Sequence, residues 1–210
     1  MAGERTIIVL AGDRERPFLE EFLRERDGAI RIETAKTPSA LRDVVARLGG
    51  KARIISFLND LIVPADVLEA LTIAPYNVHP GPPEYPGVHP ESFAIWEDAS
   101  QFGVTAHEIT AKIDEGPIVA LSRFDMPENA DRAALSDMTL RQALKVFAVV
   151  AAHCVESDEP MPKMDERWSG EKRTKNAFAT LCRSYSAASQ EEQIKLRRAC
   201  AESLESHAAA

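Results

Sequence analysis

The sequence predicts an α/β protein in which a mainly parallel sheet is flanked by helices. Short apolar segments alternate with amphipathic segments along the first 80 residues, which is typical of strand–helix–strand units. The apolar segments are nearly continuous, as expected for strands that are covered on both faces. The chain has 210 residues, 45% of them hydrophobic, which suffices for one substantial domain with its own core.

The first strand is expected at residues 6–12, a β-branched run that breaks at Gly12-Asp13. A helix follows, in which Phe18, Phe22 and Leu23 recur at helical spacing and Gly28 ends the segment. The further strands are expected at 30–35, 52–58, 74–79, 103–109 and 116–126, and the further helices at 38–49, 64–71, 91–98, 136–157 and 189–207.

Local signals support three of these helices. Thr37 followed by Pro38 is a typical helix start, and Ser189 with Glu192 forms a capping box ahead of the last helix. In the helix at 136–157 we expect one apolar stripe, made of Leu140, Leu144, Phe147 and Ala151.

Composition excludes several classes of function. The net charge of −8 repels phosphate backbones, so nucleic-acid binding through a broad basic face is disfavoured. No apolar run approaches the roughly 20 residues of a membrane-spanning helix, and the N-terminal run is interpreted as a strand and not as a signal peptide. The three cysteines, Cys154, Cys182 and Cys200, show no C-x-x-C spacing, so we expect buried, reduced thiols and a cytoplasmic protein.

A candidate site lies where the strand at 74–79 ends. In parallel sheets, ligands bind outside the carboxyl ends of the strands, and residues two apart face the same side of a strand. We therefore expect Asn77 and His79 to face one crevice. The segment PGPPEYPG that follows holds four prolines, Pro80, Pro82, Pro83 and Pro86, which restrict the backbone and stiffen the loop.

Asp114 is the third candidate, in a glycine-containing bend between two predicted strands. A histidine is suited to moving protons near neutral pH, a carboxylate beside it fixes its orientation, and an Asn amide can donate to a developing oxyanion. Together they suit attack of an amine on an acyl carbon. The structural alternative is that Asn77 and Asp114 are turn residues and that His79 has a packing role.

The segments NVHPG, EYPGVHPESFAIWED and FGVTAHEITAKIDEGPIV are together similar to the core of the folate-dependent formyltransferases. The matching positions are Asn77, His79, Gly87, Gly103-Val104-Thr105, Asp114 and Gly116, and SFLNDLIVPADVL resembles the strand and loop that hold the pterin. The resemblance covers roughly residues 5 to 125.

The resemblance implies a Rossmann-like formyltransferase fold that uses 10-formyltetrahydrofolate as formyl donor. The capping box at Ser189 predicts, in addition, a helical C-terminal extension. It implies that Asn77 polarises the formyl oxygen, that His79 handles the amine proton and that Asp114 holds His79. We expect residues 1–165 to form the catalytic domain and residues 166–210 to pack on it. The implied folate-binding residues are Leu58, Asn59, Asp60, Leu61, Ile62, Val63, Thr110, Ala111, Lys112 and Ile113.

Several alternatives stay open. The expected partner is a small-molecule amine of unknown identity, and assembly into a homo-oligomer is neither predicted nor excluded. Glycinamide ribonucleotide is a poor candidate because no phosphate-binding Gly-Ser-Asn loop follows the first strand. Hydrolysis of the formyl donor and non-catalytic folate binding are the competing functions. His107 has either a packing role or faces the site, and a metal site of His79, His89, His107 and Asp114 matches no known zinc spacing, so no metal is expected.

Overall fold

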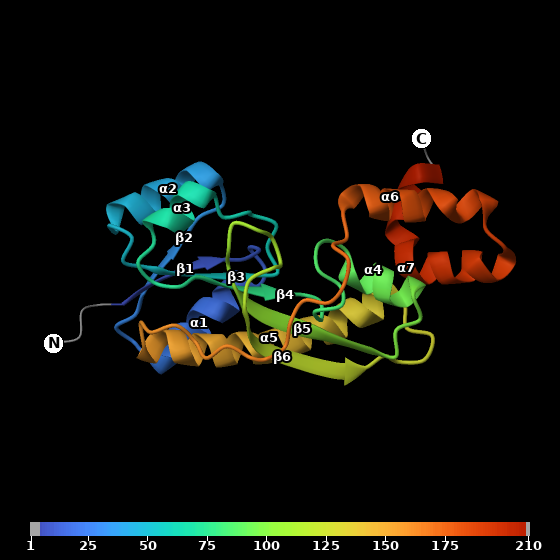
Figure 1. The fold of residues 1–210 in the computed structure, drawn as a ribbon. Helices are drawn as coiled ribbons and strands as arrows, with labels where there is room; N and C mark the ends of the chain where they lie inside the picture. The colour runs from blue at the N-terminus through green and yellow to red at the C-terminus, as the bar shows by residue number, and fades with distance from the viewer. Residues whose placement is uncertain (1–4, 209–210) are drawn as a thin grey trace. The chain divides into compact units, whose positions relative to one another are not determined.

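The structure, a computed structural model, describes residues 5–208 of the chain (Figure 1). Its strands are β1 (Thr6–Leu10), β2 (Arg31–Thr34), β3 (Arg53–Phe57), β4 (Tyr76–His79), β5 (Gln101–Glu108) and β6 (Ile118–Asp125). Its helices are α1 (Arg16–Arg26), α2 (Pro38–Arg47), α3 (Ala65–Ala70), α4 (Pro90–Trp96), α5 (Arg132–Glu156), α6 (Lys175–Arg183), the 3-10 helix η1 (Ser184–Ala187) and α7 (Gln190–Ala208). Every predicted strand and helix is present, and α6 is an element that the sequence did not reveal.

The strands form one sheet in the order β2-β1-β3-β4-β5-β6. β1 pairs in parallel with β2 and β3, and β3 pairs in parallel with β4. β5 runs antiparallel to β4, so the sheet is mixed. The prediction of a mainly parallel sheet flanked by helices is confirmed. The antiparallel strand matters for the site, because it returns along β4 beside Asn77 and His79.

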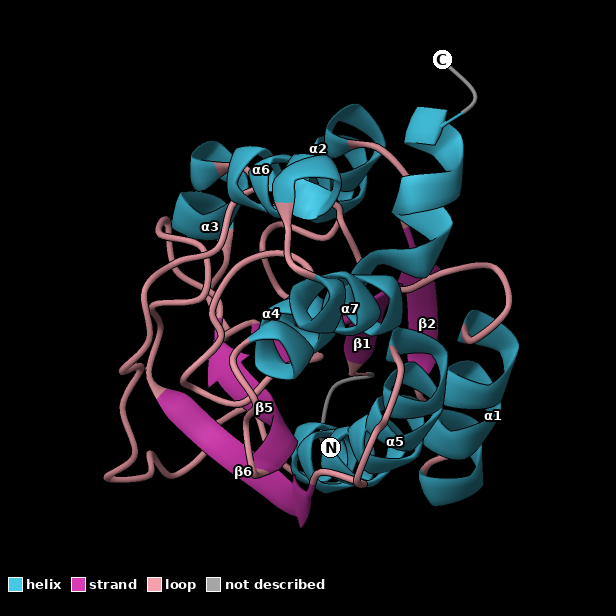
Figure 2. Cartoon of the chain, turned by 90° about the vertical axis from the view of Figure 1, so that its right-hand side faces the viewer, coloured by secondary structure: helices cyan, strands magenta, loops and turns pink. Residues whose placement is uncertain are grey.

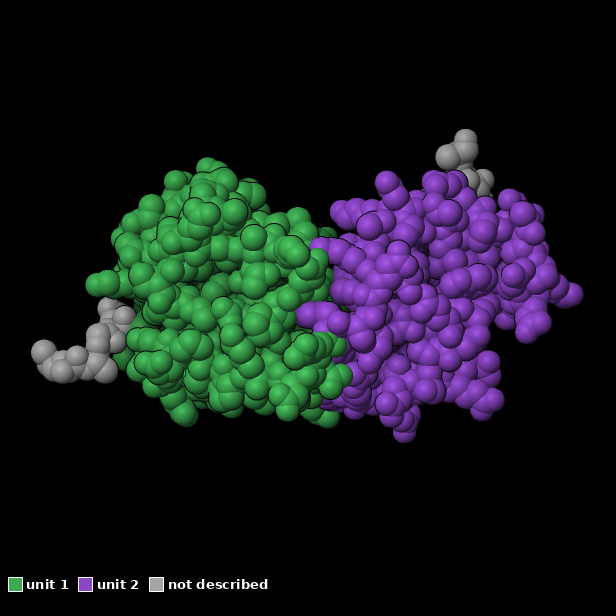
Figure 3. All heavy atoms as spheres, in the orientation of Figure 1, with its two compact units in different colours: residues 1–79, 105–121, 143–167 green, residues 80–104, 122–142, 168–210 purple. Residues whose placement is uncertain are grey.

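The chain divides into two compact units (Figure 3). Unit 1 comprises residues 1–79, 105–121 and 143–167, and unit 2 comprises residues 80–104, 122–142 and 168–210. Each unit is thus assembled from three separate stretches of the chain. The predicted division into a catalytic domain at 1–165 and an extension at 166–210 remains a prediction.

In unit 1 helices cover both faces of the sheet, with α2 and α3 on one face and α1 and α5 on the other (Figures 1 and 2). On the first face, buried side chains of β1 and β3 pack against Leu41 and Val45 of α2 and Val67 of α3. On the second face, the Phe147 ring of α5 lies 5.7 Å from the ring of Phe57 and 5.7 Å from the ring of Phe22. Burial of each such side chain contributes roughly 1.5–3 kcal/mol, so these contacts hold the strands that carry the site.

Two predicted apolar stripes were wrong in detail. In α1 the buried residues are Leu19 and Leu23, whereas Phe18 is 67% exposed. In α5 Leu144 is 41% exposed and Leu140 is half-buried, although Phe147 and Ala151 are buried as expected. Spacing alone does not say which of two adjacent helical positions faces the core, because both lie near the edge of the apolar stripe.

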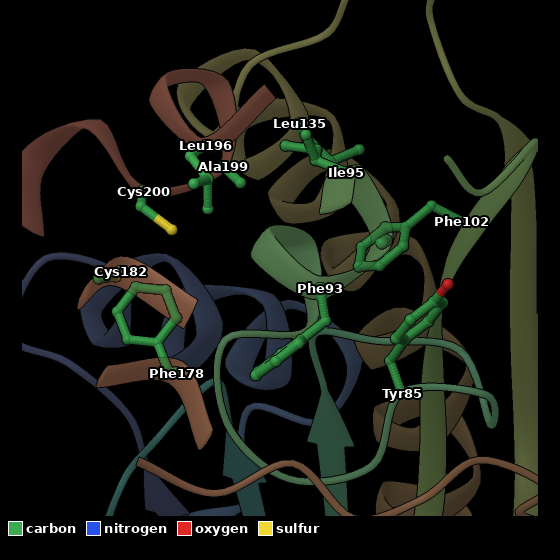
Figure 4. Close-up of a cluster of buried hydrophobic side chains, with 11 residues drawn as sticks. Tyr85, Phe93, Ile95, Phe102, Leu135, Phe178, Cys182, Leu196, Ala199 and Cys200 are labelled. Atoms are coloured by element: carbon green, nitrogen blue, oxygen red, sulfur yellow. The ribbon is translucent and has the colours of Figure 1, made fainter. Parts of the chain in front are cut away.

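Unit 2 has a core of its own, in which aromatic rings from α4, α6 and the neighbouring strand meet (Figure 4). Its buried members are Tyr85, Phe93, Ala94, Ile95, Phe102, Leu135, Phe178, Cys182, Leu196, Ala199 and Cys200. Helix α6 begins after Thr174, whose side chain accepts a hydrogen bond from the Ala177 backbone amide at 3.1 Å. The capping box predicted at Ser189 is confirmed, because Glu192 and Ser189 bond to each other's backbone amides.

The proline-rich loop after β4 is held by the segment ahead of α6, and both belong to unit 2. The Pro83 carbonyl accepts from the amides of Ser169 and Gly170, and the Pro86 carbonyl accepts from the Arg173 amide at 2.8 Å. A β-carbon at Gly170 would collide with the carbonyl oxygen of Glu84, so this approach requires glycine. Residues 169–173 therefore clamp the loop through backbone contacts.

Within residues 5–208, one helix, α5, is long and apolar enough to cross a membrane, and 44% of its most apolar window is buried inside the protein. The expectation that no segment meets this criterion was therefore wrong. Core helices of water-soluble proteins meet the same criterion, so the finding supports no conclusion about a membrane. The three cysteines are free thiols and are buried, as expected.

Candidate active site

Asn77 and His79 lie on β4, between β3 on one side and β5 on the other. Ser56 of β3 is in register with Asn77, and on the antiparallel side His107 of β5 is paired with Asn77. Residues two apart on a strand share a face, so Asn77 and His79 point to the same side of the sheet. His79 is buried, and Asn77 is half-buried.

Asp114 reaches this place because the chain turns sharply after β5. Asp114 adopts a left-handed backbone with φ of 50°, a conformation that Asp tolerates better than most residues. The Glu108 amide donates to the Pro117 carbonyl at 2.9 Å, which closes the turn at its base. A β-carbon at Gly116 would collide with the Glu108 carbonyl oxygen, so glycine is required at this position.

The three predicted residues converge. His79 Nδ1 lies 3.6 Å from Asp114 Oδ2, and both side chains are almost fully buried. This distance is an ion-pair separation and is longer than a direct hydrogen bond. The carboxylate thus lies beside one edge of the imidazole, which leaves Nε2, on the opposite edge of the ring, as the nitrogen that does not face Asp114.

His107 is a fourth member that the sequence left undecided. Its Nε2 lies 3.3 Å from Asp114 Oδ1 and 3.2 Å from the Asn77 Nδ2 amide. Asp114 therefore lies between two imidazoles, and His107 links the carboxylate to Asn77. The signal that would have found it is strand direction, because only an antiparallel β5 puts His107 opposite Asn77.

Hydrogen bonding fixes the tautomer of His107. Its Nδ1 lies 2.9 Å from the Glu108 carbonyl oxygen, and a carbonyl can only accept, so Nδ1 carries a proton. Nε2 is then the nitrogen that faces the Asn77 Nδ2 amide and the Asp114 carboxylate, and without a proton it accepts a hydrogen bond from the amide.

The predicted folate-binding residues lie on two loops of unit 1. The first begins at Leu58, which has a φ of 45° and donates its amide to the Val78 carbonyl at 3.2 Å. It continues through a turn in which Asn59 Oδ1 accepts from the Leu61 amide at 2.8 Å. In the second loop, Thr110 Oγ1 donates to the Lys112 carbonyl at 2.9 Å.

The two loops approach the same apolar cluster. Val63 is buried in the cluster, and Leu61 and Ile109 pack against it. Ile62 is 61% exposed and Ile113 is 42% exposed, so each loop presents an apolar side chain to its surroundings. Flat ring systems bind on such side chains while neighbouring backbone groups satisfy their polar edges. The loops fit the predicted ligand chemically, and their role remains a prediction.

The hypothetical metal site is not assembled. Among the side chains that the structure describes, no group of three or more from His, Cys, Asp or Glu is arranged to hold a metal ion. His89 belongs to unit 2, where its ring stacks on Phe178 with the centroids 3.9 Å apart. His89 thus contributes to the unit 2 core boundary, whereas His79, His107 and Asp114 belong to unit 1.

Solved structures share the fold. A sugar N-formyltransferase from a Shewanella species superposes with a TM-score of 0.75 over 94% of this chain and 88% of that chain, at 18% sequence identity. An N-formyltransferase from Helicobacter canadensis, in complex with folinic acid and dTDP-3-aminofucose, gives a TM-score of 0.66 over 93% of this chain and 80% of that chain, at 15% identity. At these identities the likeness shows the fold alone.

Sequence comparison gives the family. The methionyl-tRNA formyltransferase of Roseiflexus castenholzii is 32% identical over 105 residues, which are 50% of this chain and 33% of that relative. The match thus spans about a third of the relative's length. Residues 32–151 match the formyl transferase family, a segment that contains Asn77, His79, His107 and Asp114. The chain therefore belongs to the formyl transferase family.

Proposed function

We propose that this chain transfers a formyl group from 10-formyltetrahydrofolate to an amine of a small-molecule acceptor by direct attack. The observation that carries the proposal is the buried Asp114 carboxylate between His79 and His107, with Asn77 beside them. A buried carboxylate is costly unless it is paired, so its retention beside two proton carriers favours a chemical role.

Asn77 acts on the oxygen of the formyl group. As the acceptor nitrogen bonds to the formyl carbon, negative charge develops on that oxygen, and the Asn77 Nδ2 amide donates a hydrogen bond to it. The contact between Asn77 and His107 at 3.2 Å orients the amide beforehand. A preorganised donor of this kind contributes about 10²–10³-fold to kcat.

His79 moves the proton. Its Nε2 accepts the proton that the attacking amine loses, while Asp114 holds the ring from the Nδ1 side at 3.6 Å. The same proton then passes to the leaving nitrogen of the donor as the carbon–nitrogen bond breaks, which gives a formamide and tetrahydrofolate. His107, 3.3 Å from the other carboxylate oxygen, holds Asp114 in place.

The donor would be held by the loops at 58–63 and 110–113. The exposed Ile62 and Ile113 offer apolar contact for a pterin ring. The neighbour from Helicobacter canadensis is a complex with folinic acid, which supports a folate as the donor of this chain. The donor supplies an activated formyl carbon, and the residues named above orient it and exclude water.

An amino sugar is the acceptor to test first. The Shewanella neighbour is a sugar N-formyltransferase, and the Helicobacter canadensis complex contains an amino sugar nucleotide. The curated relative acts on methionyl-tRNA by its name, but the net charge of −8 disfavours a tRNA acceptor for this chain. A small-molecule amine is therefore the acceptor we propose.

The function is tested by following tetrahydrofolate release from 10-formyltetrahydrofolate with and without amines. We expect turnover to depend on an amino sugar or amino sugar nucleotide, with a formamide as the second product. Equal turnover without any amine would show that the chain is a hydrolase of the donor. Tight folate binding without turnover, unchanged by His79→Ala, would show a non-catalytic binding protein.

Replacement of Asn77 tests its role separately. We expect Asn77→Ala to bind folate as the wild type does and to lower kcat by about 10²-fold or more, because one oxyanion donor is lost. Folate binding is measured by fluorescence titration and kcat by product release. Unchanged turnover would exclude Asn77 from the mechanism.

A further inference from the structure

Tyr76 lies on β4 and points to the face of the sheet opposite Asn77 and His79, because neighbouring residues of a strand alternate between the two faces. Its side chain is fully buried. Its hydroxyl accepts a hydrogen bond from the Met161 backbone amide at 2.7 Å. Loss of this bond would leave a buried amide without its acceptor, so the contact holds Met161 firmly against β4.

Met161 belongs to the segment at residues 157–164, which we call the strap (orange, after α5, in Figure 1). A proline on each side of Met161 restricts the backbone, so this part of the strap is stiff. A second contact fixes its end, where the Met164 amide donates to the Ile118 carbonyl at 2.8 Å. Three residues of chain reach at most about 10 Å, so the strap links β4 and β6 over a short span.

Arg53 anchors the other end of the strap. It is only 2% exposed, and its guanidinium donates to the carbonyls of Ser157 and Glu159 at 3.0 and 3.3 Å. It also donates to the Ala74 carbonyl, just ahead of β4, at 3.1 Å, and lies 5.4 Å from the centre of the Tyr76 ring. Arg53 thus joins the strap to the start of β4.

The strap meets the base of the loop that carries Asp114. This loop, residues 109–117, runs from β5 to β6 and enters β6 at Ile118, the residue that the strap binds. At its other end the Ile109 amide donates to the Pro75 carbonyl, just ahead of β4, at 2.9 Å. Both ends of the loop are therefore tied to β4, the first directly and the second through the strap.

The position of Asp114 depends on these ties. His79 lies on β4 and Asp114 lies on the loop, so the 3.6 Å separation between His79 Nδ1 and Asp114 Oδ2 is set by how the loop is held against β4. A loop that is tied at one end only would let the carboxylate move away from the imidazole. A misplacement of about 1 Å can cost about 10²-fold in rate.

We propose that Tyr76 is a positioning residue, which acts through the strap to hold the Asp114 carboxylate between His79 and His107. This rests on the proposed function, in which Asp114 holds His79 during proton transfer. Tyr76 points away from Asn77 and His79, so its effect on the reaction is indirect.

The first test removes the Tyr76 hydroxyl. Tyr76→Phe keeps the ring and takes away the acceptor of the Met161 amide. We expect the imidazole nitrogen chemical shifts of His79 and His107, measured by NMR, to move towards their values in Asp114→Asn, because the carboxylate is held less firmly beside both rings. The chain has five histidines, so few ring signals need assignment. This measurement requires no turnover.

Thr37→Ala is the matched control. The Thr37 hydroxyl also accepts from a backbone amide of unit 1, that of Ala40 at 3.1 Å, so both variants remove one hydrogen bond of the same kind. Thr37→Ala should leave the imidazole shifts and kcat as in the wild type. Tyr76→Phe should lower kcat about tenfold and leave the KM for the formyl donor within about twofold, because the reacting groups and not the donor loops are disturbed.

The second anchor gives an independent test. Met164→Pro removes the amide that donates to Ile118, since proline has no N–H. Met164→Ala keeps that amide and removes a side chain that is 43% exposed. We expect Met164→Pro to reproduce the shifts and the loss of kcat of Tyr76→Phe, and Met164→Ala to behave as the wild type. Circular dichroism confirms that each variant is folded.

Wild-type imidazole shifts in Tyr76→Phe or in Met164→Pro would overturn the proposal. Equal changes in Thr37→Ala or Met164→Ala would also overturn it, because they would show a general loss of stability. A chain that transfers no formyl group, and whose imidazole shifts still respond only to Tyr76→Phe and Met164→Pro, would reject the proposed function and keep the positioning role of Tyr76.

Discussion

Units 1 and 2 bury polar groups in different ways. In unit 1, His79, His107 and Asp114 are buried in mutual contact. In unit 2 the core is apolar and aromatic, and a buried polar residue such as Thr139 bonds to the backbone, its hydroxyl donating to the Leu135 carbonyl at 2.8 Å. Since buried polar groups lower stability unless they are paired, a cluster of them is expected only where chemistry requires it. The difference points to unit 1 as the source of the catalytic groups.

The polar loops of the two units also differ. The loop that carries Asp114 is fixed so that one side chain faces two imidazoles. The proline-rich loop of unit 2 is fixed by backbone contacts to residues 169–173, with Arg123 and Glu84 forming a bidentate ion pair beside it. The first loop presents one carboxylate to two imidazoles, whereas the second maintains a backbone shape.

The largest effect is expected from Asp114→Asn. This change keeps the left-handed backbone, which Asn adopts readily, and removes the charge between the two imidazoles. We expect kcat to fall about 10²–10⁴-fold, the range for loss of an acid–base system, with folate binding retained. Activity is measured as amine-dependent tetrahydrofolate release.

Asp98→Asn is the matched control in unit 2. Asp98 also has a left-handed backbone, with φ of 53°, and its carboxylate pairs with Lys195. Its carboxylate is exposed, so kcat should stay within about twofold of the wild type, and the surface ion pair contributes at most about 1 kcal/mol. If both variants lost activity equally, the special position of Asp114 would be disproved.

A pair of glycine variants sharpens the contrast between the two loops. In Gly116→Ala the new methyl group collides with the Glu108 carbonyl oxygen, and in Gly170→Ala it collides with the Glu84 carbonyl oxygen. Each should lower the free energy of unfolding by roughly 1–3 kcal/mol, as overpacking does. Urea unfolding measures both losses.

Their kinetics should differ. Gly116→Ala moves Asp114 and should lower kcat at saturating acceptor, because the reacting groups lose their geometry. Gly170→Ala should leave kcat nearly unchanged, because its clash with the Glu84 carbonyl distorts a loop that carries none of the proposed catalytic residues. Equal losses of kcat in the two variants would mean that the loops do not differ in role.

The sequence predicted what local patterns and chain order determine. Asn77 and His79 were placed correctly because they lie in a buried strand, at its carboxyl end. The Thr37 cap was predicted correctly because it binds the amide of Ala40, only three residues away. Helix α6 was missed although its sequence carries local signals, a Thr174 cap and the buried Phe178 and Cys182 four residues apart. The polar segment ahead of it, up to residue 176, drew the prediction towards irregular structure.

The same limit applies to the site. The match to the family at Asp114 and Gly116 indicated Asp114. The contact of His107 with Asp114 depends instead on the antiparallel pairing of β5 with β4, which the alternation of strands and helices along the sequence does not specify. The exposed Leu144 was misassigned to the core because periodicity gives the width of an apolar stripe and not its partner. The direction of a strand and the element that covers an apolar stripe are both set by the tertiary structure.

A third effect concerns alkaline pH. Burial, with Glu97 nearby, raises the pKa of Tyr85 from 10.0 to about 12 in the folded protein. The unfolded chain therefore loses this proton first, so the contribution of Tyr85 to stability is present below pH 10 and is lost as the pH rises towards 12. In Tyr85→Phe the fall in the free energy of unfolding over this range should be shallower.

Urea unfolding between pH 9 and pH 12 measures this dependence, with Tyr185→Phe as the control. Tyr185 only borders the same unit 2 core, and its hydroxyl contacts Arg197 at 2.5 Å. An identical pH dependence in Tyr85→Phe and the wild type would contradict the assignment to Tyr85.

The smallest effect comes from two matched helix caps. Thr37 accepts a hydrogen bond from the Ala40 amide at 3.1 Å at the start of α2 in unit 1, and Thr174 accepts one from the Ala177 amide at 3.1 Å at the start of α6 in unit 2. Thr37→Ala and Thr174→Ala should each lower the free energy of unfolding by about 1 kcal/mol. Amide hydrogen exchange then tells whether the loss is local. If the units open separately, Thr37→Ala speeds exchange only in unit 1 and Thr174→Ala only in unit 2, whereas a shared rise across both units would show that they unfold as one body.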